Sequence, residues 1–271
     1  MFENQNIGFV GGGNMGEALI RGLLAASLFT ADRISAFDVS ASRIEYLTKE
    51  YGIRSSESLG ALADSSRIIL LAVKPQVIAP VLSQLRTHIT REKLVLSIVA
   101  GVPLGRLEGE FPAGVPVIRV MPNTPALVQE GASALSRGKA VSSEQMEMGL
   151  AMFRAVGKAV EVEEKWMDIV TGLSGSAPAY VLLMIEAMID AGVLMGLPRP
   201  LARTLVVQTF LGTSTMLDKT GKHPAELKDM ITSPGGTTIA GLRMLENKAV
   251  RGAIFEAVAA ATKRSEELGK S

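Results

Sequence analysis

The stretch Gly8–Leu19, "GFVGGGNMGEAL", sets Gly11, Gly13 and Gly16 in a Gly-x-Gly-x-x-Gly spacing between an apolar run and a helical pattern. In such a turn the first glycine permits a tight bend. The second lets backbone approach a phosphate, and the third lets helix and strand pack closely. The spacing alone is a weak signal, but here a second strand ends about twenty residues later, at Asp38. We therefore expect a dinucleotide to bind where a helix begins near Asn14.

Apolar runs alternate with helical patterns from residue 5 to about residue 164. Residues 6–11, 33–38, 67–73, 93–100 and 115–121 have the composition of strands, and residues 14–27, 40–51 and 76–89 have helical spacing. Near-continuous apolar strands that alternate with helices are typical of a parallel sheet covered on both faces. Residues 1–164 are thus predicted to form an α/β domain, a Rossmann-type doubly wound sheet.

From residue 165 to residue 271 the strand signals stop, and an all-α C-terminal domain is expected. Its helices are predicted at 165–195, 199–220, 223–231, 237–246 and 247–269. The segment Tyr180–Leu197 is apolar on nearly every side except a stripe with Glu186 and Asp190, which should face water or a basic partner. We expect a buried helix, and since about 105 residues can cover it only partly, we predict a helical homodimer interface.

Composition excludes several classes of function. Among 271 residues, 47% are hydrophobic and 20% charged, and the net charge of +1 gives no electrostatic reason to bind nucleic acid or anionic lipid. Without cysteine, and with only His88 and His223 as imidazoles, no metal site is expected, and each histidine is interpreted as a surface or helix-cap residue. No export signal is recognised, and the two carboxylates in the most apolar segment argue against a membrane span, so a cytoplasmic protein is expected.

The residues after the second strand leave the cofactor open. Asp38 stands where an acid would hydrogen-bond the adenine-ribose hydroxyls of NAD, whereas Arg43, together with Ser40, can instead hold the 2′-phosphate of NADP. A purely structural alternative is that Asp38 caps the next helix.

Three further loops are predicted at the same carboxyl edge of the sheet, where open α/β sheets bind ligands. They are "AVKP", with Lys74 and Pro75; "SIVAG", Ser97–Gly101; and "MPNTPA", Met121–Ala126. Their small residues would admit a flat nicotinamide ring, although Pro75 is equally well explained as the residue that ends the strand and starts a helix.

The segment Met230–Leu242, "MITSPGGTTIAGL", has hydroxyls, two glycines and a proline but nothing that ionises between Asp229 and Arg243. Glycines let backbone N–H groups converge on an anion at the start of a helix, which suits a small carboxylate. The competing interpretation is an ordinary helix start, with Ser233 or Thr237 as cap.

With "GGGNMG", "AVKP", "MPNTPA", "GSAPAY", "GLPR" and "HPAELKDMITSPGGTTI" in this order, the chain resembles the pyrroline-5-carboxylate reductase family over essentially its full length. The resemblance implies reduction of 1-pyrroline-5-carboxylate to L-proline by NAD(P)H, with an interlocked helical dimer domain and, in some members, decamers. "GSAPAY" departs from the family's common "GSGPAY", because Ala177 adds a methyl group that limits backbone approach.

By resemblance, substrate contacts come from the neutral loop, and Thr238 hydrogen-bonds the ring nitrogen. The implied substrate residues are Ser233, Gly236, Thr237 and Thr238. The implied cofactor residues are Gly11, Gly13, Asn14, Met15, Gly16, Ala72, Val73, Lys74, Pro75, Ala100, Asn123 and Pro125, beside Asp38, Ser40 and Arg43. NADPH is favoured, and Asp38 leaves NADH open.

Two rival functions share the fold. A β-hydroxyacid dehydrogenase usually employs a lysine on the first long helix of its second domain, but this chain has none between Lys165 and Lys219. A dinucleotide-sensing regulator would keep the cofactor without turnover. The sequence also leaves open whether a six-membered imine acid, larger by one methylene, is accepted.

Overall fold

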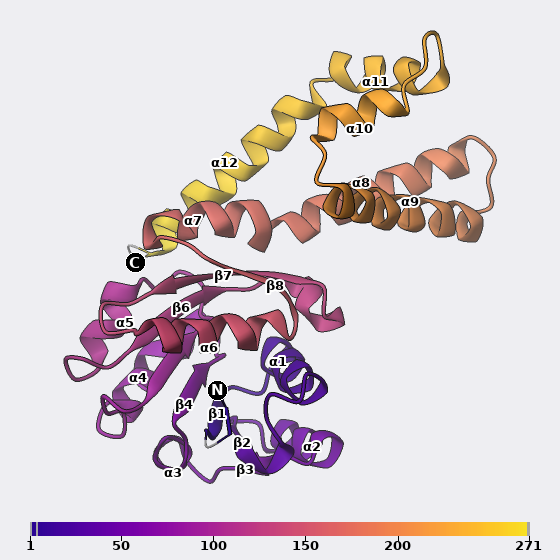
Figure 1. Ribbon diagram of the computed structural model, residues 1–271. Helices are drawn as coiled ribbons and strands as arrows, with labels where there is room; N and C mark the ends of the chain where they lie inside the picture. Colours follow the sequence, from indigo (N-terminus) through magenta and orange to yellow (C-terminus); the bar gives the residue numbers. More distant parts are fainter. Residues whose placement is uncertain (1, 4, 270–271) are drawn as a thin grey trace. The chain divides into compact units, whose positions relative to one another are not determined.

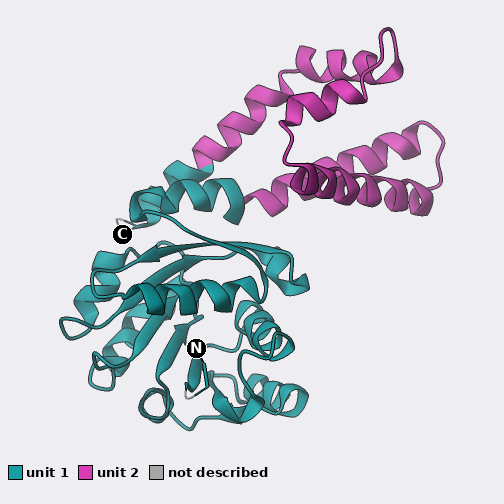
Figure 2. Cartoon of the chain, viewed as in Figure 1, with its two compact units in different colours: residues 1–175, 261–271 teal, residues 176–260 magenta. Residues whose placement is uncertain are grey.

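The computed structural model describes residues 2–3 and 5–269, and the chain divides into two compact units (Figure 2). Unit 1 comprises residues 1–175 and 261–271, and unit 2 comprises residues 176–260. The C-terminal segment belongs to unit 1 because the Ser265 hydroxyl donates to Asp168 Oδ1 at 2.6 Å, and both side chains lie within that unit.

Unit 1 is built on an eight-stranded sheet with the order β3-β2-β1-β4-β5-β6-β7-β8 (Figure 1). The strands are β1 (Ile7–Val10), β2 (Ile34–Phe37), β3 (Arg54–Ser55), β4 (Ile68–Leu71), β5 (Leu94–Ser97), β6 (Val117–Met121), β7 (Gly131–Arg137) and β8 (Gly157–Glu161). The first six are parallel, and β7 runs antiparallel to β6. The chain reverses at the sheet position beside β1, between β1 and β4, as in doubly wound folds.

The helices of unit 1 alternate with these strands. They are α1 (Asn14–Ala25), η1 (Ala31–Arg33), α2 (Ala41–Tyr51), α3 (Leu59–Ser65), η2 (Pro75–Val77), α4 (Ile78–Leu85), α5 (Leu104–Glu110), η3 (Thr124–Val128), α6 (Ser143–Arg154), η4 (Glu164–Trp166), α7 (Met167–Val170) and the π-helical segment η5 (Thr171–Gly175).

Two hydrophobic cores confirm that the sheet is covered on both faces. Phe9 and Leu70 pack in one core with residues of α1, α2 and α6. Their strand neighbours Val10 and Leu71 pack in the other core with residues of α3, α4 and α5. Since successive strand residues point to opposite faces, this division shows why these strands are apolar at nearly every position.

The sheet is not parallel throughout, which corrects the expectation. Between β6 and β7 lies only the short η3, too little chain for a crossover helix, so β7 returns antiparallel to its neighbour. The strands β7 and β8 contain few β-branched residues, and β3 has only two residues, so none of the three gave a clear apolar signal.

Unit 2 is entirely helical, as expected. It holds α8 (Ala177–Leu194), α9 (Arg199–Thr220), α10 (Pro224–Met230), α11 (Thr237–Asn247) and the first part of α12 (Val250–Gly269). The predicted helix 165–195 is interrupted by the π-helical segment before α8, where Gly172 and Gly175 fall.

The expectation that Tyr180–Leu197 is a buried helix is wrong for the single chain. No residue of α8 is buried, and Leu182 and Leu183 are 64% and 65% exposed. By length and composition alone, the helical segment Glu164–Leu194 would be able to cross a membrane. As expected, Glu186 and Asp190 are exposed, and Asp190 Oδ1 lies 2.7 Å from Arg199 Nη1. Within the described part of the chain, the apolar surface of α8 is therefore only partly covered.

Candidate active site

The glycine loop between β1 and α1 has the geometry that the spacing predicts. Gly11 has φ +101°, and a Cβ atom there would lie 2.6 Å from the Ala72 carbonyl oxygen; at Gly16 it would lie 2.7 Å from the Gly11 carbonyl oxygen. At Gly13, by contrast, a Cβ atom would meet nothing within 4 Å. The first and third glycines are therefore required by packing, and the second leaves an open approach for a ligand at the start of α1.

The N-terminus of α1 is suited to an anion. Its N-cap is Gly13, whose backbone is extended and which offers no side-chain hydrogen bond to the first turn. Asn14 and Met15 form that first turn, so their backbone N–H groups have no partner within the helix. The loop thus fits the pyrophosphate of a dinucleotide.

Asp38 joins the glycine loop to the end of β2. Its Oδ2 accepts a hydrogen bond from the Gly12 N–H at 2.7 Å, and its Oδ1 accepts one from the Ser40 N–H at 2.9 Å. The N-cap residue of α2 is Ser40 itself, so the alternative that Asp38 caps this helix is wrong. The carboxylate fixes the loop and keeps spare lone pairs, since each of its oxygens has two.

Arg43, in the first turn of α2, lies against the same loop. Its Nε donates to the Gly12 carbonyl oxygen, and its Nη2 forms an ion pair with Glu17 of α1. The Ser40 hydroxyl lies 3.1 Å from that of Ser42. The structure therefore brings Asp38 and Arg43 together at Gly12, with the Ser40 N–H bound to Asp38; that these residues hold an adenine ribose stays a prediction.

A cavity of about 340 Å³ opens beside this loop. Its walls are mainly apolar. They come from the carboxyl ends of β1, β2 and β4 and from α3, η2 and α4: Val10, Gly11, Phe37, Asp38, Val39, Leu59, Val73, Val77, Pro80, Val81 and Gln84. Its size and lining suit a flat aromatic group such as adenine, with the carboxylate of Asp38 at its border.

The loop after β4 packs beneath the glycines. The Ala72 N–H donates to the Val10 carbonyl oxygen at 2.8 Å, and Val73 Cγ1 would lie 3.1 Å from a Cβ at Gly11. Lys74 is exposed and stands at the N-cap of η2, whose first residue is Pro75. Pro75 thus has the structural role weighed from the sequence, and Lys74 leaves its ammonium in solvent at the carboxyl edge.

The loops after β5 and β6 complete this edge of unit 1. Ala100 is exposed beside Gly101, whose φ is +73°. The Asn123 side chain is engaged at both ends: its Oδ1 accepts from the Ala132 N–H at 2.8 Å, and its Nδ2 donates to the Ser174 carbonyl oxygen at 3.1 Å. Asn123 therefore holds the loop in place, and Pro125 is the second residue of η3, which packs on α1.

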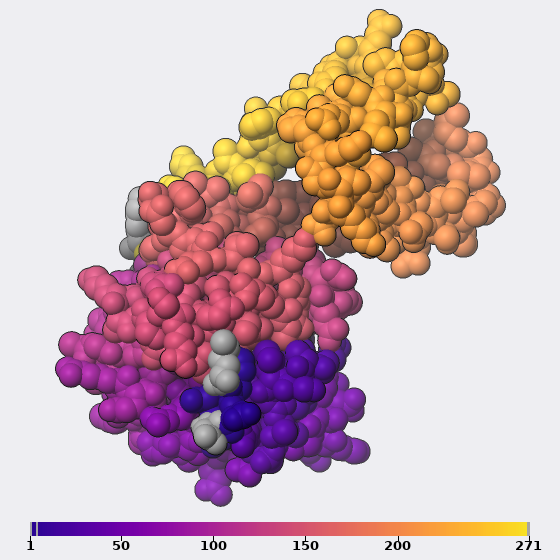
Figure 3. Space-filling view, in the orientation of Figure 1, coloured from indigo at the N-terminus to yellow at the C-terminus, as the bar shows by residue number. Residues whose placement is uncertain are grey.

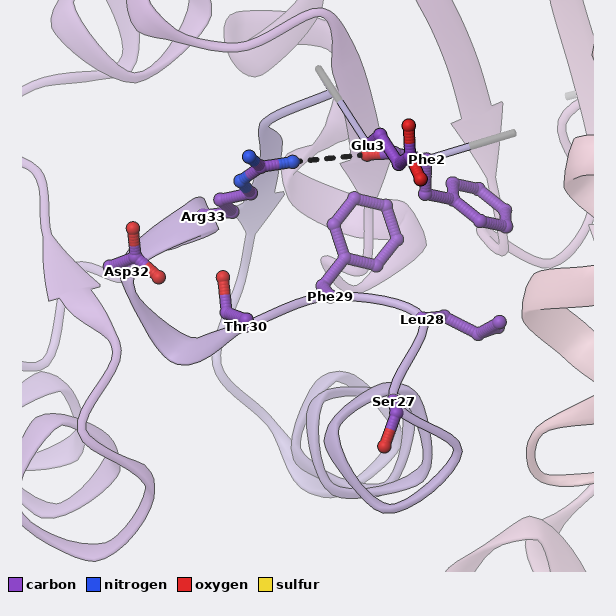
Figure 4. Close-up of a pocket in the computed structure, with 8 residues that line it drawn as sticks. All are labelled: Phe2, Glu3, Ser27, Leu28, Phe29, Thr30, Asp32 and Arg33. Atoms are coloured by element: carbon purple, nitrogen blue, oxygen red, sulfur yellow. Dashed lines mark hydrogen bonds between the residues drawn. The ribbon is translucent and has the colours of Figure 1, made fainter.

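A larger hollow, of about 680 Å³, lies before β1 and β2 (Figure 4). The rings of Phe2 and Phe29 are 4.9 Å apart there, and Arg33 Nη1 donates to the Phe2 carbonyl oxygen at 3.4 Å. These residues precede β1 and β2, at the edge opposite the glycine loop. None of the predicted site residues lines this hollow, so size alone does not locate the site.

The predicted substrate loop, residues 231–236 of unit 2, lies at the surface between α10 and α11 (orange, Figure 3). Gly235 has φ +70°, and the Gly236 N–H closes a turn onto the Ser233 carbonyl oxygen at 3.1 Å. Gly236 is the N-cap of α11, and no side chain caps this helix, which contradicts the interpretation of Ser233 or Thr237 as cap. The first N–H groups of α11, at Thr237 and Thr238, thus have no partner within the helix.

The histidines behave as the sequence predicted. His223 is the N-cap of α10, where its Nδ1 accepts from the Ala225 N–H at 3.2 Å, and His88 pairs with Asp64 at 2.9 Å near the surface. Within residues 2–3 and 5–269, no group of three or more potential His, Asp or Glu ligands is close enough to hold a metal ion.

Glu17 is a residue that sequence reasoning missed. Its carboxylate accepts hydrogen bonds from Tyr46 and Tyr51 of α2, at 3.1 and 2.7 Å, besides pairing with Arg43. Burial alone would raise the pKa of Glu17, but the hydrogen bonds from Arg43, Tyr51 and Tyr46 together hold it below its ordinary value. The signal was present in the sequence, since Glu17 follows Gly16 directly and Arg43 and Tyr46 share one face of a helix.

A doubly wound sheet with this glycine loop, joined to an all-helical unit, defines a class: oxidoreductases that use a nicotinamide dinucleotide. Comparison with known families agrees with it. The family model described as "NADP oxidoreductase coenzyme F420-dependent" matches residues 6–101, and the model described as "Pyrroline-5-carboxylate reductase dimerisation" matches residues 164–268.

Full-length relatives identify the family within that class. Pyrroline-5-carboxylate reductase of Methanosarcina acetivorans is 49% identical over 268 residues, which cover 99% of both chains. That of Escherichia coli K12 is 41% identical over 267 residues, covering 98% of this chain and 99% of the relative. The chain belongs to the pyrroline-5-carboxylate reductase family.

Solved structures agree in fold. The enzyme of Coxiella burnetii, 32% identical, superposes with a TM-score of 0.94 over 99% of this chain and 100% of that one. The Plasmodium falciparum enzyme, solved with NADP bound, is 37% identical with a TM-score of 0.89 and the same coverage.

Proposed function

We propose that this protein reduces 1-pyrroline-5-carboxylate to L-proline with NADPH as the favoured cofactor and NADH as a possible substitute. Membership of the family over the full chain length carries this proposal. The glycine loop supports it independently, because the vacant approach at Gly13 is where a dinucleotide pyrophosphate needs backbone contact.

The cofactor residues have separate tasks in this proposal. Gly13, Asn14 and Met15 receive the pyrophosphate at the start of α1, and Asp38, Ser40 and Arg43 surround the adenine ribose. The residues Ala72, Val73, Lys74, Pro75, Ala100, Asn123 and Pro125 form the loops along the nicotinamide side. When bound, the reduced nicotinamide supplies a hydride to the imine carbon.

The substrate loop positions the acid with neutral groups. Ser233, Gly236, Thr237 and Thr238 offer hydroxyls and N–H groups to the substrate carboxylate and ring nitrogen, at a helix start with no side-chain cap. Since a protonated imine is already a strong electrophile, the chain mainly needs to orient it and exclude water. Thr238 hydrogen-bonds the ring nitrogen, which ends as an amine once hydride has reached the neighbouring carbon.

The helical part is proposed to form a homodimer, which some members of the family extend to a decamer. An apolar groove of about 630 Å³ between α8 and α9 supports this, since its lining includes the exposed Leu182 and Leu183. We retain residues 1–164 as the dinucleotide domain and 165–271 as the substrate and dimerisation domain, in a cytoplasmic enzyme that binds neither nucleic acid nor a membrane.

Absorbance at 340 nm tests the activity. Purified protein with pyrroline-5-carboxylate should oxidise NADPH, and more slowly NADH, with proline as the product in equal amount. A protein that binds either nucleotide but oxidises neither with this substrate contradicts the proposal and favours a dinucleotide-sensing role. Parallel assays with the six-membered imine acid measure how far the pocket distinguishes one methylene.

A further inference from the structure

A network of side chains joins α1 to α2 beside the glycine loop. Glu17 lies at its centre and receives Arg43, Tyr46 and Tyr51 on one carboxylate. The paired side chains of Arg43 and Glu17 are only 26% and 19% exposed, so solvent screens them incompletely. The Arg43–Glu17 pair is therefore a partly buried ion pair between α1 and α2 and not an exposed surface contact.

Arg43 is held in place from three directions. Its Nε is bound to the Gly12 carbonyl oxygen, its Nη2 to Glu17, and its guanidinium carbon lies 5.0 Å from the centre of the Tyr46 ring. A guanidinium fixed in this way presents only its remaining N–H groups to a ligand beside the loop. Its charge is also offset by the carboxylate that it touches.

The charges around this subsite sum to −1, which matters for the choice of cofactor. Asp38 and Glu17 bring two carboxylates and Arg43 brings one cation to the surroundings of Gly12. NADP carries an extra phosphate on the adenine ribose, whereas NAD carries a neutral hydroxyl there. A carboxylate that offsets the arginine therefore weakens binding of the phosphorylated cofactor and leaves the other almost unaffected.

We propose that Glu17 is the positioning residue that sets the preference between NADPH and NADH, because it holds and neutralises Arg43. The inference rests on the proposed function in one respect, namely that a nicotinamide dinucleotide binds at the glycine loop. The lowered pKa of Glu17 agrees with it, since the carboxyl stays ionised at neutral pH.

Calorimetric titration of the full-length protein with NADP⁺ and with NAD⁺ tests the proposal without turnover. In Glu17→Gln the ratio of NADP⁺ to NAD⁺ affinity should rise about five- to twenty-fold, since an unscreened arginine then faces the phosphate. The control is Glu45→Gln, which removes the same charge from an exposed position of α2 and should leave the ratio within about two-fold.

A second pair of variants assigns the effect to Arg43. In Glu17→Gln/Arg43→Met the gain should disappear, and Arg43→Met alone should lower the ratio less than about three-fold, because Glu17 already offsets that charge. A ratio that is unchanged or lower in Glu17→Gln, or an equal rise in Glu45→Gln, overturns the proposal. The proposal is also overturned if Arg43→Met alone lowers the ratio of NADP⁺ to NAD⁺ affinity more than about ten-fold. This last test does not require that the Glu17 variant folds.

The outcome for the proposed function is read separately from the 340 nm assay. A shifted binding ratio in a protein that does not reduce pyrroline-5-carboxylate supports the role of Glu17 and contradicts the reductase. If the protein is an active reductase but the binding ratio in Glu17→Gln is unshifted, the reductase is supported and the role of Glu17 is contradicted. Wild-type protein that binds neither nucleotide overturns both.

Discussion

The two units use similar helices in opposite ways. In unit 1, α6 buries Met146, Met152 and Phe153 in one core with Ile118 of β6 and Leu135 of β7. In unit 2, the more apolar α8 buries nothing, and within residues 176–260 only Ala202 and Leu227 are buried. Unit 1 therefore owes its stability to its own core, whereas most apolar side chains of unit 2 are left without full cover within residues 176–260.

The same contrast divides the candidate site. The cofactor half is already shaped inside unit 1, where Asp38 and Arg43 fix the glycine loop with hydrogen bonds. The substrate loop of unit 2 is exposed at Ser233 and Gly235, and its helix start has no side-chain cap. Hydrogen bonds fix the cofactor half of the candidate site, whereas backbone N–H donors of the substrate loop have no side-chain cap. The two halves therefore call for different experiments.

The largest effect is expected from a charge placed on the apolar groove of α8. Leu183→Glu should raise the dimer dissociation constant at least about a hundred-fold, because a two-fold axis buries the new carboxylate twice. Analytical ultracentrifugation over a range of concentrations measures it.

The control for this experiment is Val160→Glu on β8 of unit 1, a residue of similar exposure at 57%. It should leave the oligomeric state unchanged. If Leu183→Glu behaved like this control, unit 2 would be stable without a partner and the comparison between the units would fail.

Thr238→Ala tests whether the open loop takes part in the reaction. Loss of the hydrogen bond to the ring nitrogen should lower kcat/KM about ten- to a thousand-fold, or about 1.4–4 kcal/mol. Steady-state assays at 340 nm with each cofactor give this value.

Thr215→Ala on α9 is the matched variant, since its hydroxyl only donates to the Leu211 carbonyl oxygen one turn earlier. Its kcat/KM should stay within about two-fold of wild type. Equal rates for wild type and Thr238→Ala would remove Thr238 from the mechanism.

A pair of glycine substitutions contrasts the packing of the two units directly. At Gly22 of α1 a methyl group would lie 2.3 Å from Val156 Cγ1, so Gly22→Ala should lower the free energy of unfolding by about 1–3 kcal/mol. At Gly212 of α9 an added Cβ atom would meet nothing within 4 Å apart from the neighbouring backbone of its own helix. Gly212→Ala should therefore stabilise that helix by up to about 1 kcal/mol.

Chemical denaturation and dimer affinity, measured together, give both results. If Gly212→Ala instead weakens the dimer, a second copy packs on α9 at this position, which sharpens the comparison. If Gly22→Ala left the free energy of unfolding unchanged, the side chains around Gly22 in unit 1 would rearrange more easily than their packing indicates.

The smallest effect concerns pH. The pKa of Glu17 is lowered in the folded state, so its stabilising contribution is fully present above the ordinary value of 4.5 and is lost as the pH falls below it. The Tm of wild type should therefore be about 1–3 °C higher than that of Glu17→Gln at pH 7, and this difference in Tm should narrow towards pH 3.

Glu45→Gln, which changes an exposed side chain of α2, should show no pH-dependent gap in Tm from wild type. A Tm difference between wild type and Glu17→Gln that persisted unchanged into acid would mean that shape, not charge, makes the Glu17 contacts stabilising.

Sequence reasoning located the parts of the site that depend on local backbone. The tight turn at Gly11, the open position at Gly13 and the start of α11 at Thr237 follow from residues near one another in the chain. It missed what depends on contact between distant elements. Glu17 meets Tyr51 across α1 and α2, and the engagement of Asn123 with Ser174 links positions far apart in sequence.

Two corrections have the same origin. The direction of β7 was decided by the short connection η3 and by its pairing with β6, not by its own composition. The exposure of α8 could not be predicted from its apolar sequence, since that pattern requires cover without saying which chain provides it.

By itself, the sequence determined the alternation of strands and helices in residues 1–164, the helical remainder, the glycine loop and the family. Periodicity and glycine spacing extend over a few residues, so they can be recognised in the amino-acid sequence alone. Only the tertiary structure decided that Asp38 clamps Gly12, that Glu17 holds Arg43, and that unit 2 lacks a core of its own. Those outcomes depend on which surfaces meet in space, where hydrogen bonds and buried area are shared between elements that no local pattern connects.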